Sequence, residues 1–271
     1  MGDTPELAAE YARVSGTQFQ AGLFLLDRLQ LRPGMRVLDV GCGTGNLTAH
    51  MAALVGGGDG GGGGGRVVGV DPSPERLAVA REVAARALGG EGRVGLYEGA
   101  AEDLSRFGDG SFDAVVVNST LHWVGDQARA LREVARVLRP GGRVGISGGS
   151  GDFETAQERI KAAVLGRAPY RAYADPAPPR FLGRAELGRL LDAAGFAGPR
   201  EMVVNRIVKT AASADDMIDW LDASSSGKTY GGIPPELRPA AREEMRAEWN
   251  KLLTPEGIRM DMELLVTVAA K

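Results

Sequence analysis

The pattern of hydrophobic and polar residues divides the first half of the chain into alternating strand-like and helix-like stretches. A short apolar run over residues 35–40 precedes a glycine-rich turn, and apolar residues then recur at helical spacing over residues 47–55. Further helical repeats are interspersed with strand-like runs at residues 66–70, 93–97, 111–118 and 144–147. Strands that alternate with helices are typical of a mostly parallel sheet covered on both faces. We therefore expect a doubly wound α/β fold.

The turn after the first predicted strand contains three glycines, Gly41, Gly43 and Gly45. Glycines let a backbone turn tightly and approach a ligand closely, and the start of the following helix offers free N–H groups to an anionic group. Proteins that bind dinucleotides favour the pattern G-x-G-x-x-G, which would require a glycine where Asn46 stands. The turn thus indicates a nucleotide cofactor but disfavours a dehydrogenase.

Asp71 ends the second predicted strand and is a candidate for binding ribose hydroxyls. It follows Gly41 by 30 positions. Setting aside the glycine-rich stretch at residues 56–65 leaves roughly 20, the spacing at which an acidic residue meets a ribose in βαβ nucleotide-binding units. Ser73 and Pro74 then suit the N-cap and the first position of a helix.

Four motifs follow one another over residues 37–142. They read VLDVGCGTGNLT, GVDPSPERL, FDAVVVNSTLHWV and ALREVARVLRPGG. In this order the chain resembles the class I S-adenosylmethionine-dependent methyltransferases. The resemblance implies S-adenosyl-L-methionine as the cofactor and a Rossmann-like sheet of seven strands in the order 3-2-1-4-5-7-6. It also implies methyl transfer to an oxygen, nitrogen or carbon atom of a small-molecule substrate.

The resemblance assigns residues to the cofactor site as well. The implied cofactor-binding residues are Asp39, Gly41, Cys42, Gly43, Gly45, Asn46, Asp71, Pro72, Ala101, Glu102, Asn118 and Tyr11. The chain departs from the family pattern at Ala100, where members often have an aspartate that binds the adenine amino group. The backbone N–H of Ala101 can still reach the adenine edge, and Glu102 or Asp103 is a candidate for the lost acceptor.

We expect an N-terminal helical arm over residues 1–30 and a methyltransferase domain over residues 31–271. The arm is predicted to form two helices that break near Ser15, with Tyr11 either covering the cofactor or packing against the arm. Residues 56–65 are nine glycines and one aspartate, which indicates a flexible surface loop away from the ligand edge of the sheet. Residues 211–257 are predicted to form a helical lid insertion over the substrate.

Composition narrows the expected partners and location. The net charge of −3 leaves no basic excess for phosphate contacts, so nucleic acid is not expected as a partner. The chain has no apolar run of about 18 residues that could span a membrane, and its start has acidic residues rather than an apolar signal core. We expect a cytoplasmic protein that acts on a small molecule, does not bind membranes, and is a monomer or a homodimer.

Catalytic candidates are few because the chain has two histidines, His50 and His122, and one cysteine, Cys42. His122 follows the fourth predicted strand, at the edge of the sheet where ligands bind. It is therefore either a catalytic general base or a residue of the pocket wall. His50 is expected to pack at the rim of the first helix after the glycine turn. Neither histidine belongs to a cluster with metal-ligand spacing, so no metal is expected.

Two alternative functions follow from the same residues. Methyltransferases that act on arsenite bind the trivalent metalloid through several thiolates, and the single Cys42 disfavours that activity. A protein that binds the cofactor without catalysis is disfavoured only by the intact motifs. Aromatic residues after residue 150, including Tyr170, Phe181 and Trp220, suit either the wall of an apolar substrate pocket or the lid's own core.

Overall fold

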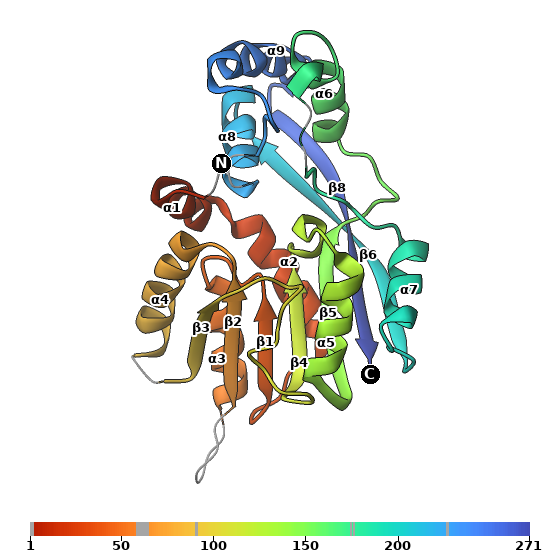
Figure 1. Ribbon diagram of the computed structural model, residues 1–271. Helices are drawn as coiled ribbons and strands as arrows, with labels where there is room; N and C mark the ends of the chain where they lie inside the picture. The colour runs from red at the N-terminus through yellow and green to blue at the C-terminus, as the bar shows by residue number, and fades with distance from the viewer. Residues whose placement is uncertain (1–2, 58–64, 90–91, 174, 176, 226–227) are drawn as a thin grey trace.

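The computed structural model describes residues 3–57, 65–89, 92–173, 175, 177–225 and 228–271 (Figure 1). Its described α-helices are α1 (Pro5–Val14), α2 (Gly16–Leu29), α3 (Asn46–Gly56), α4 (Pro74–Leu88), α5 (Gln127–Val137), α6 (Ala156–Leu165), α7 (Arg184–Ala193), α8 (Ala214–Ser224) and α9 (Arg238–Asn250). Its short 3₁₀ helices are η1 (Leu121–Trp123), η2 (Tyr170–Tyr173) and η3 (Pro235–Leu237). Its strands are β1 (Arg36–Val40), β2 (Arg66–Asp71), β3 (Val94–Glu98), β4 (Phe112–Asn118), β5 (Leu138–Gly149), β6 (Arg200–Ala211), β7 (Leu253–Thr254) and β8 (Gly257–Ala270). Most of the predicted glycine-rich loop, residues 58–64, lies outside the described part of the chain.

The strands form one mixed sheet in the order β3-β2-β1-β4-β5-β8-β6, and the two-residue β7 pairs with β8 outside this path. The strands from β3 to β5 are parallel, whereas β8 runs antiparallel to both β5 and β6. The last long strand therefore lies between the fifth and sixth, which confirms the predicted order 3-2-1-4-5-7-6. The short β7 was not predicted.

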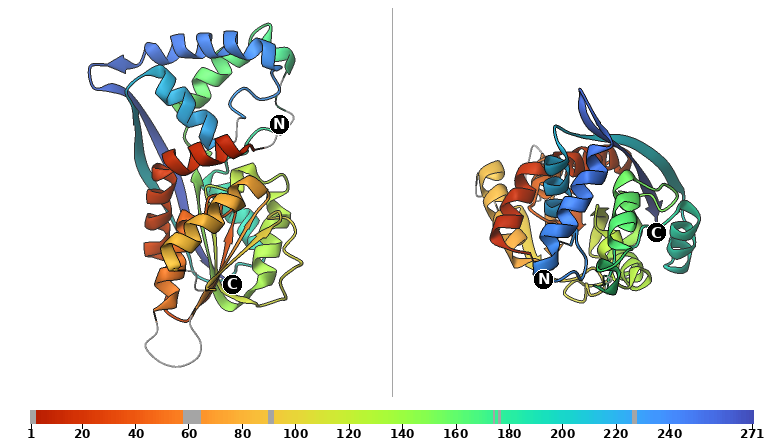
Figure 2. Two further views of the ribbon diagram at one scale, coloured as in Figure 1. Left: turned by 90° about the vertical axis from the view of Figure 1, so that its left-hand side faces the viewer. Right: turned by 90° about the horizontal axis from the view of Figure 1, so that it is seen from above.

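Helices cover both faces of the sheet, as Figure 2 shows for α2 and α3 on one side and α5 on the other. Leu25 of α2 and Met51 of α3 pack against one face of the central strands. Leu131 of α5 and Leu191 of α7 pack against the opposite face. Parallel strands buried on both sides read as continuous apolar runs, which explains why β1 and β4 were recognisable in the sequence.

The fifth strand begins earlier than predicted. The sequence predicted a strand-like run at residues 144–147, whereas β5 extends from Leu138 to Gly149 and so includes the glycine-containing turn sequence at residues 139–143. The pairing of β4 with β5 shifts from Phe112–Leu138 to Ala114–Arg143, and Gly141 between them has a φ of +73°. The glycine-rich turn is thus an irregular bulge within a longer strand, because only glycine adopts such a φ without strain.

The helices α6, α8 and α9 lie together beyond the carboxyl ends of the parallel strands (Figure 1). They share a separate hydrophobic cluster that includes Ile160 of α6, Met217 of α8 and Trp249 of α9. The strands β6 and β8 reach into this cluster, to which Ile258 and Met260 belong. We call α6, η2, α8, η3 and α9 the cap. Its helices α8 and α9 fall within the predicted lid at residues 211–257, but α6 and η2 were not predicted to join it.

The arm has the two helices that the sequence predicted, with the break at Ser15. The N-cap predicted at Ser73 is confirmed, since the Ser73 hydroxyl accepts a hydrogen bond from the Arg76 N–H at 3.1 Å. None of the described helices combines the length and the apolar character that a membrane span requires.

Candidate active site

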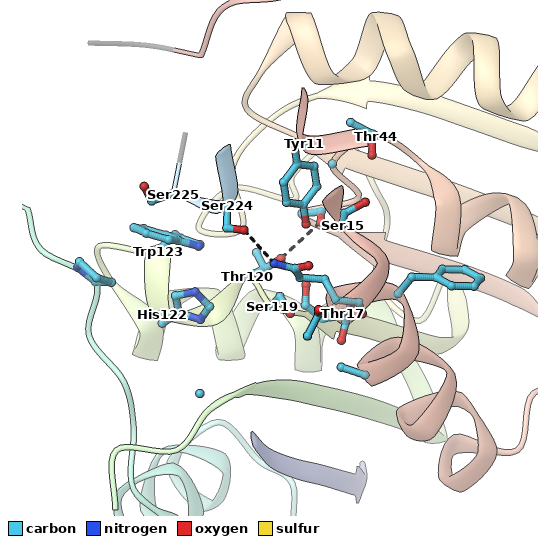
Figure 3. A pocket seen from close by; sticks show the side chains of 18 of the residues that line it. Tyr11, Ser15, Thr17, Thr44, Ser119, Thr120, His122, Trp123, Ser224 and Ser225 are labelled. Atoms are coloured by element: carbon cyan, nitrogen blue, oxygen red, sulfur yellow. Dashed lines mark hydrogen bonds between the residues drawn. The ribbon is translucent and has the colours of Figure 1, made fainter. Parts of the chain in front are cut away.

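A cavity of about 750 Å³ lies between the carboxyl ends of the central strands, the N-terminal arm and the cap. Ligand pockets in proteins measure about 300–1,000 Å³, so this cavity has room for a nucleoside and a second small molecule. Figure 3 shows its labelled side chains converging from different elements: Tyr11, Ser15 and Thr17 from the arm, Thr44, Thr120 and His122 from the sheet side, and Ser224 and Ser225 from the end of α8. We call the region of the cavity at the glycine turn and the start of α4 the turn end. The region lined by Lys161, Lys228 and the rings of His122, Trp123 and Phe181 is the cap end.

The glycine turn forms the floor of the turn end. Gly41 and Gly45 have φ values of +72° and +79°, which side chains other than glycine rarely adopt. A Cβ atom at Gly45 would lie 2.8 Å from the Cβ of Ala80, and one at Gly41 would clash with Thr120. A Cβ at Gly43 would meet only the Tyr11 ring, at 3.7 Å. Packing therefore demands glycine at two of the three positions, while the third opens onto the cavity.

Two buried carboxylates, Asp39 and Asp71, line the turn end. The Asp71 carboxylate accepts hydrogen bonds from the backbone N–H of Gly43 at 2.8 Å and of Ser73 at 3.0 Å. Burial raises its pKa, while these two N–H groups act in the opposite direction. A carboxylate has about four acceptor positions, so two positions on Asp71 are left for a ligand with paired hydroxyls.

Asp39 is the more deeply constrained of the two. Its side chain is 2% exposed and accepts a hydrogen bond from the Thr48 hydroxyl at 2.6 Å. Burial raises the pKa of Asp39 to about 7; the bond from Thr48 lowers it, and the nearby Asp71 raises it further.

The other residues predicted for cofactor binding divide into two groups. Cys42, Asn46, Pro72, Asn118 and Tyr11 line the cavity together with the glycines. Ala101 and Glu102 are absent from the lining among the described residues. The Glu102 carboxylate instead accepts hydrogen bonds from the backbone N–H groups of Gly125 at 3.0 Å and Asp126 at 3.3 Å.

Asp103 is turned away in the same manner. Its carboxylate accepts a hydrogen bond from the Ser105 N–H at 3.0 Å. The structure thus brings together the residues after β1, β2 and β4. The two candidates for the missing adenine acceptor, Glu102 and Asp103, instead accept hydrogen bonds from backbone N–H groups of the protein.

The arm and the cap meet across the cavity through Gln18, a residue that the sequence did not single out. The side-chain amide of Asn118 donates to the backbone carbonyl oxygen of Gln18 at 3.1 Å. The side-chain amide of Gln18 donates to the Ser224 hydroxyl oxygen at 3.1 Å. Figure 3 shows the latter bond as the dashed line that ends on Ser224. The side-chain oxygens of Gln18 and Asn118 are buried and have no hydrogen-bond partner within the described residues. Buried acceptors are nearly always paired, so this pair of oxygens indicates a ligand with N–H or O–H donors.

A second set of contacts closes the turn end. The Arg76 guanidinium pairs with the Asp3 carboxylate and lies over the Tyr11 ring, 4.2 Å from its centroid. The Trp220 indole on α8 donates to the Val14 carbonyl at 3.3 Å. Tyr11 therefore lines the cavity and packs against Arg76 of α4, and its predicted contact with the cofactor stays a prediction.

His122 lies in an aromatic wall with Trp123 and Phe181. Its ring stacks on Phe181 with 4.8 Å between centroids and is tilted against Trp123 at 4.9 Å. Burial lowers the pKa of His122 to about 4, and within the described residues no hydrogen bond reaches the imidazole. The ring is therefore neutral at physiological pH, and its low basicity favours a wall residue over a general base.

The second histidine and the aromatic residues after 150 also have defined places. His50 meets the edge of the Phe19 ring at 5.9 Å between centroids, which agrees with a packing role. Tyr170 and Trp249 belong to the hydrophobic cluster of the cap. Trp220 belongs to that cluster and also lines the cavity, so the aromatic residues serve both as lid core and as pocket wall.

The described residues offer few groups that could bind a metal ion or act as a thiolate. Within the described residues, His, Cys, Asp and Glu form no group of three or more that could hold a metal ion. Cys42 is buried in the glycine turn, and burial raises the pKa of its thiol well above the usual value. The thiol is therefore protonated and a weak ligand at neutral pH.

Residues 38–146 match the family model described as a methyltransferase domain. The chain is 32% identical over 234 residues to the nocamycin O-methyltransferase of Saccharothrix syringae, and the alignment covers 82% of this chain and 80% of that protein. It is 39% identical over 142 residues to an uncharacterised methyltransferase of Mycobacterium bovis, of which it spans about half the length, 51%.

The fold is shared with solved structures as well. The YcgJ protein of Bacillus subtilis superposes with a TM-score of 0.64 at 19% identity, covering 93% of this chain and 98% of that one. At this identity the likeness establishes the architecture of the sheet and its helices.

Proposed function

The chain belongs to the class I S-adenosylmethionine-dependent methyltransferase family, and we propose that it transfers a methyl group from S-adenosyl-L-methionine to a small molecule held at the cap end of its cavity. The observation that carries the proposal is the shape of the cavity. One continuous space joins the glycine turn and Asp71 to an aromatic wall under the cap. A cofactor and an acceptor bound at its two ends would face each other across His122 and Asn118.

The residues at the turn end fit the proposed cofactor. The two remaining acceptor positions on Asp71 suit the two hydroxyls of a ribose, and Gly43 leaves the backbone open to close approach. The unpaired oxygens of Gln18 and Asn118 suit the N–H donors of an amino-acid group. We therefore propose Tyr11, Gln18, Asp39, Asp71, Pro72 and Asn118, with the turn at residues 41–46, as the cofactor site.

Ala101 and Glu102 are omitted from this set. Glu102 would have to release two backbone N–H groups before it could accept a hydrogen bond from adenine. Gly125 and Asp126 are exposed, so water can replace Glu102 at these N–H groups. The omission therefore rests on the absence of Ala101 and Glu102 from the described lining of the cavity.

The chain contributes position rather than proton transfer. The cofactor supplies a methyl group already activated on a sulfonium, so the reaction needs an aligned acceptor in a site that excludes water. The His122, Trp123 and Phe181 rings, with His122 stacked on Phe181 and tilted against Trp123, provide an aromatic wall for such an acceptor. His122, with a pKa of about 4, is a poor proton acceptor at neutral pH, so we propose it as a wall residue.

The alternative of arsenite methylation is disfavoured by the structure as well as by composition. A single buried and protonated thiol, Cys42, cannot supply the several thiolates that trivalent arsenic requires. The cytoplasmic location and the monomeric or homodimeric state expected from the sequence stay predictions.

The proposal is tested by calorimetry followed by transfer of a labelled methyl group. We expect S-adenosylmethionine and its demethylated product to bind with micromolar affinity, and NAD not to bind. Labelled cofactor incubated with a metabolite extract should yield a labelled small molecule only when the protein is present. Binding of NAD in preference to S-adenosylmethionine would refute the cofactor assignment, and binding without transfer to any acceptor would favour a non-catalytic protein.

A further inference from the structure

The acidic and basic side chains at the cap end of the cavity differ in the partners that the protein gives them. Two acidic residues line this end, Glu158 and Glu263. The Glu158 carboxylate accepts hydrogen bonds from the N–H and the hydroxyl of Thr155, at 2.6 and 2.8 Å. The Glu263 carboxylate forms an ion pair with Arg206 at 2.9 Å. Glu263 is therefore paired with a cation, whereas Glu158 is held by neutral groups of Thr155 and keeps its negative charge.

The two lysines that line the same end have no such partner. Lys161 lies on α6, half-buried, and within the described residues it forms no hydrogen bond and no ion pair shorter than 4.0 Å. The carboxylates of Asp175, Glu158 and Asp222 attract it only from a greater distance, and burial outweighs them and lowers its pKa. An ammonium group held partly out of water without a paired anion is an unfavourable arrangement that an anionic ligand would relieve.

Lys228 places a second cation beside the aromatic wall. Its ammonium nitrogen lies 5.6 Å from the centroid of the Trp123 ring, and Trp123 in turn packs against His122 and Phe181. No carboxylate in the described part of the chain pairs with Lys228. The cap end thus combines an aromatic wall with two lysines, the half-buried Lys161 on α6 and the exposed Lys228 after α8, and within the described residues neither forms an ion pair shorter than 4.0 Å.

We propose that the methyl acceptor is a planar, largely apolar small molecule with a carboxylate group, which Lys161 binds as its counter-ion while the ring lies against Trp123, His122 and Phe181. This inference rests on the proposed function, because it assigns the cap end to the acceptor. The carboxylate serves as the recognition group, and Lys228 adds a second positive charge near the same wall. Hydrogen bonds to a charged partner contribute more than neutral ones, so the lysine gives specificity for acids over their uncharged analogues.

The experiment compares matched pairs of aromatic acids and their amides. The probes are indole-3-acetate with indole-3-acetamide, and 4-hydroxybenzoate with 4-hydroxybenzamide, titrated up to 10 mM into the protein with and without S-adenosylhomocysteine, with isothermal titration calorimetry as the readout. We expect at least one acid to bind about tenfold or more tightly than its amide, the preference that a charge-assisted hydrogen bond provides. Lys161→Gln should abolish this preference and Lys161→Arg should retain most of it. Lys251→Gln removes the same charge from a lysine paired with Glu248 outside the cavity, and it should change nothing.

Three results would overturn the inference: equal binding of acids and amides, no binding of any probe, or an undiminished preference in Lys161→Gln. The last would mean that Lys161 serves Asp222 and Glu158 instead of a ligand. Affinity for S-adenosylhomocysteine, measured in the same samples, reports on the proposed function separately. Loss of cofactor binding in the wild-type protein, with the acid preference intact, would reject the methyltransferase activity and keep the anion site.

Discussion

The Gln18 amide of the N-terminal arm donates a hydrogen bond to the Ser224 hydroxyl of cap helix α8 at 3.1 Å, across 206 positions of sequence. The bond bridges the cavity above the end of β4, where Asn118 donates to the Gln18 carbonyl. Three elements distant in sequence are thereby joined over the proposed cofactor site.

We expect the Gln18–Ser224 bond to slow cofactor release. A single neutral hydrogen bond contributes about 0.5–1.5 kcal/mol, so Ser224→Ala should raise the dissociation rate of S-adenosylhomocysteine roughly 2–10-fold. Stopped-flow displacement measures this rate. Gln20→Ala, on the exposed face of the same arm helix, is the control and should leave the rate unchanged. In the Ser224→Ala background the bond is already absent, so adding Gln18→Ala should raise the dissociation rate by less than it does in the wild type. Full additivity of the two changes would contradict the bridge.

Asp71→Ala should weaken binding of S-adenosylmethionine by about 10–100-fold. The change removes the acceptor positions proposed for the ribose and frees the N–H groups of Gly43 and Ser73 that the carboxylate now holds. Glu98→Ala is a matched control, because Glu98 pairs in register with Asp71 at the same edge of the sheet but lies outside the cavity. Calorimetry that finds equal affinity in the two variants would remove Asp71 from the site.

His122→Gln should leave methyl transfer within about tenfold of the wild type between pH 5.5 and 8.5. With a pKa of about 4, the imidazole stays neutral throughout this range and imposes no titration on the rate. A positioned general base typically contributes about 10²–10⁴-fold. Single-turnover rates that fall by that factor in His122→Gln, with cofactor affinity intact, would show that the ligand-bound site restores its basicity and that His122 is catalytic.

The same residue should make the fold sensitive to acid. The folded state binds the proton of His122 less readily than the unfolded chain, whose imidazole has a pKa of 6.5. Stability contributed by the neutral ring is therefore present above pH 6.5 and is lost as the pH falls toward 4. Urea unfolding should show a shallower loss of stability over this window in His122→Phe than in the wild type, and parallel curves would contradict the burial of the ring.

Asp39 should act in the opposite direction. Its folded-state pKa of about 7 lies above the usual aspartate value of 3.8, so the folded protein retains a proton that the unfolded chain releases. Stability should fall as the pH rises from about 4 to 7 on account of this group. Asp39→Asn keeps an acceptor for Thr48 without the charge, and it should flatten the dependence in ligand-free protein. A steeper fall in the variant would show that Asp39 is ionised in the fold.

The strand order was expected from the resemblance to the methyltransferase family, whereas the sequence alone indicated the parallel strands and the glycine turn. These features depend on local patterns: continuous apolar runs mark the buried strands β1 and β4, glycine is required at Gly41 and Gly45 by their φ values, and Ser73 followed by Pro74 marks a helix start. Asp71 lies beside the glycine turn in space despite the long glycine insertion between them in the sequence. Parallel strands bring their carboxyl ends to one edge of the sheet, whatever the length of the connection between them.

Only the tertiary structure decided how the side chains around that edge are used. Glu102 could face the cavity or hold the backbone of Gly125, and the choice depends on where a segment 23 residues away folds. The burial of His122 depends on Phe181, and the bridge of Gln18 depends on Ser224. The inclusion of α6 in the cap, and with it the position of Lys161, depends on packing against α8 and α9. Hydrogen-bond partners and desolvation come from contacts between distant segments, so no local pattern of residues specifies them.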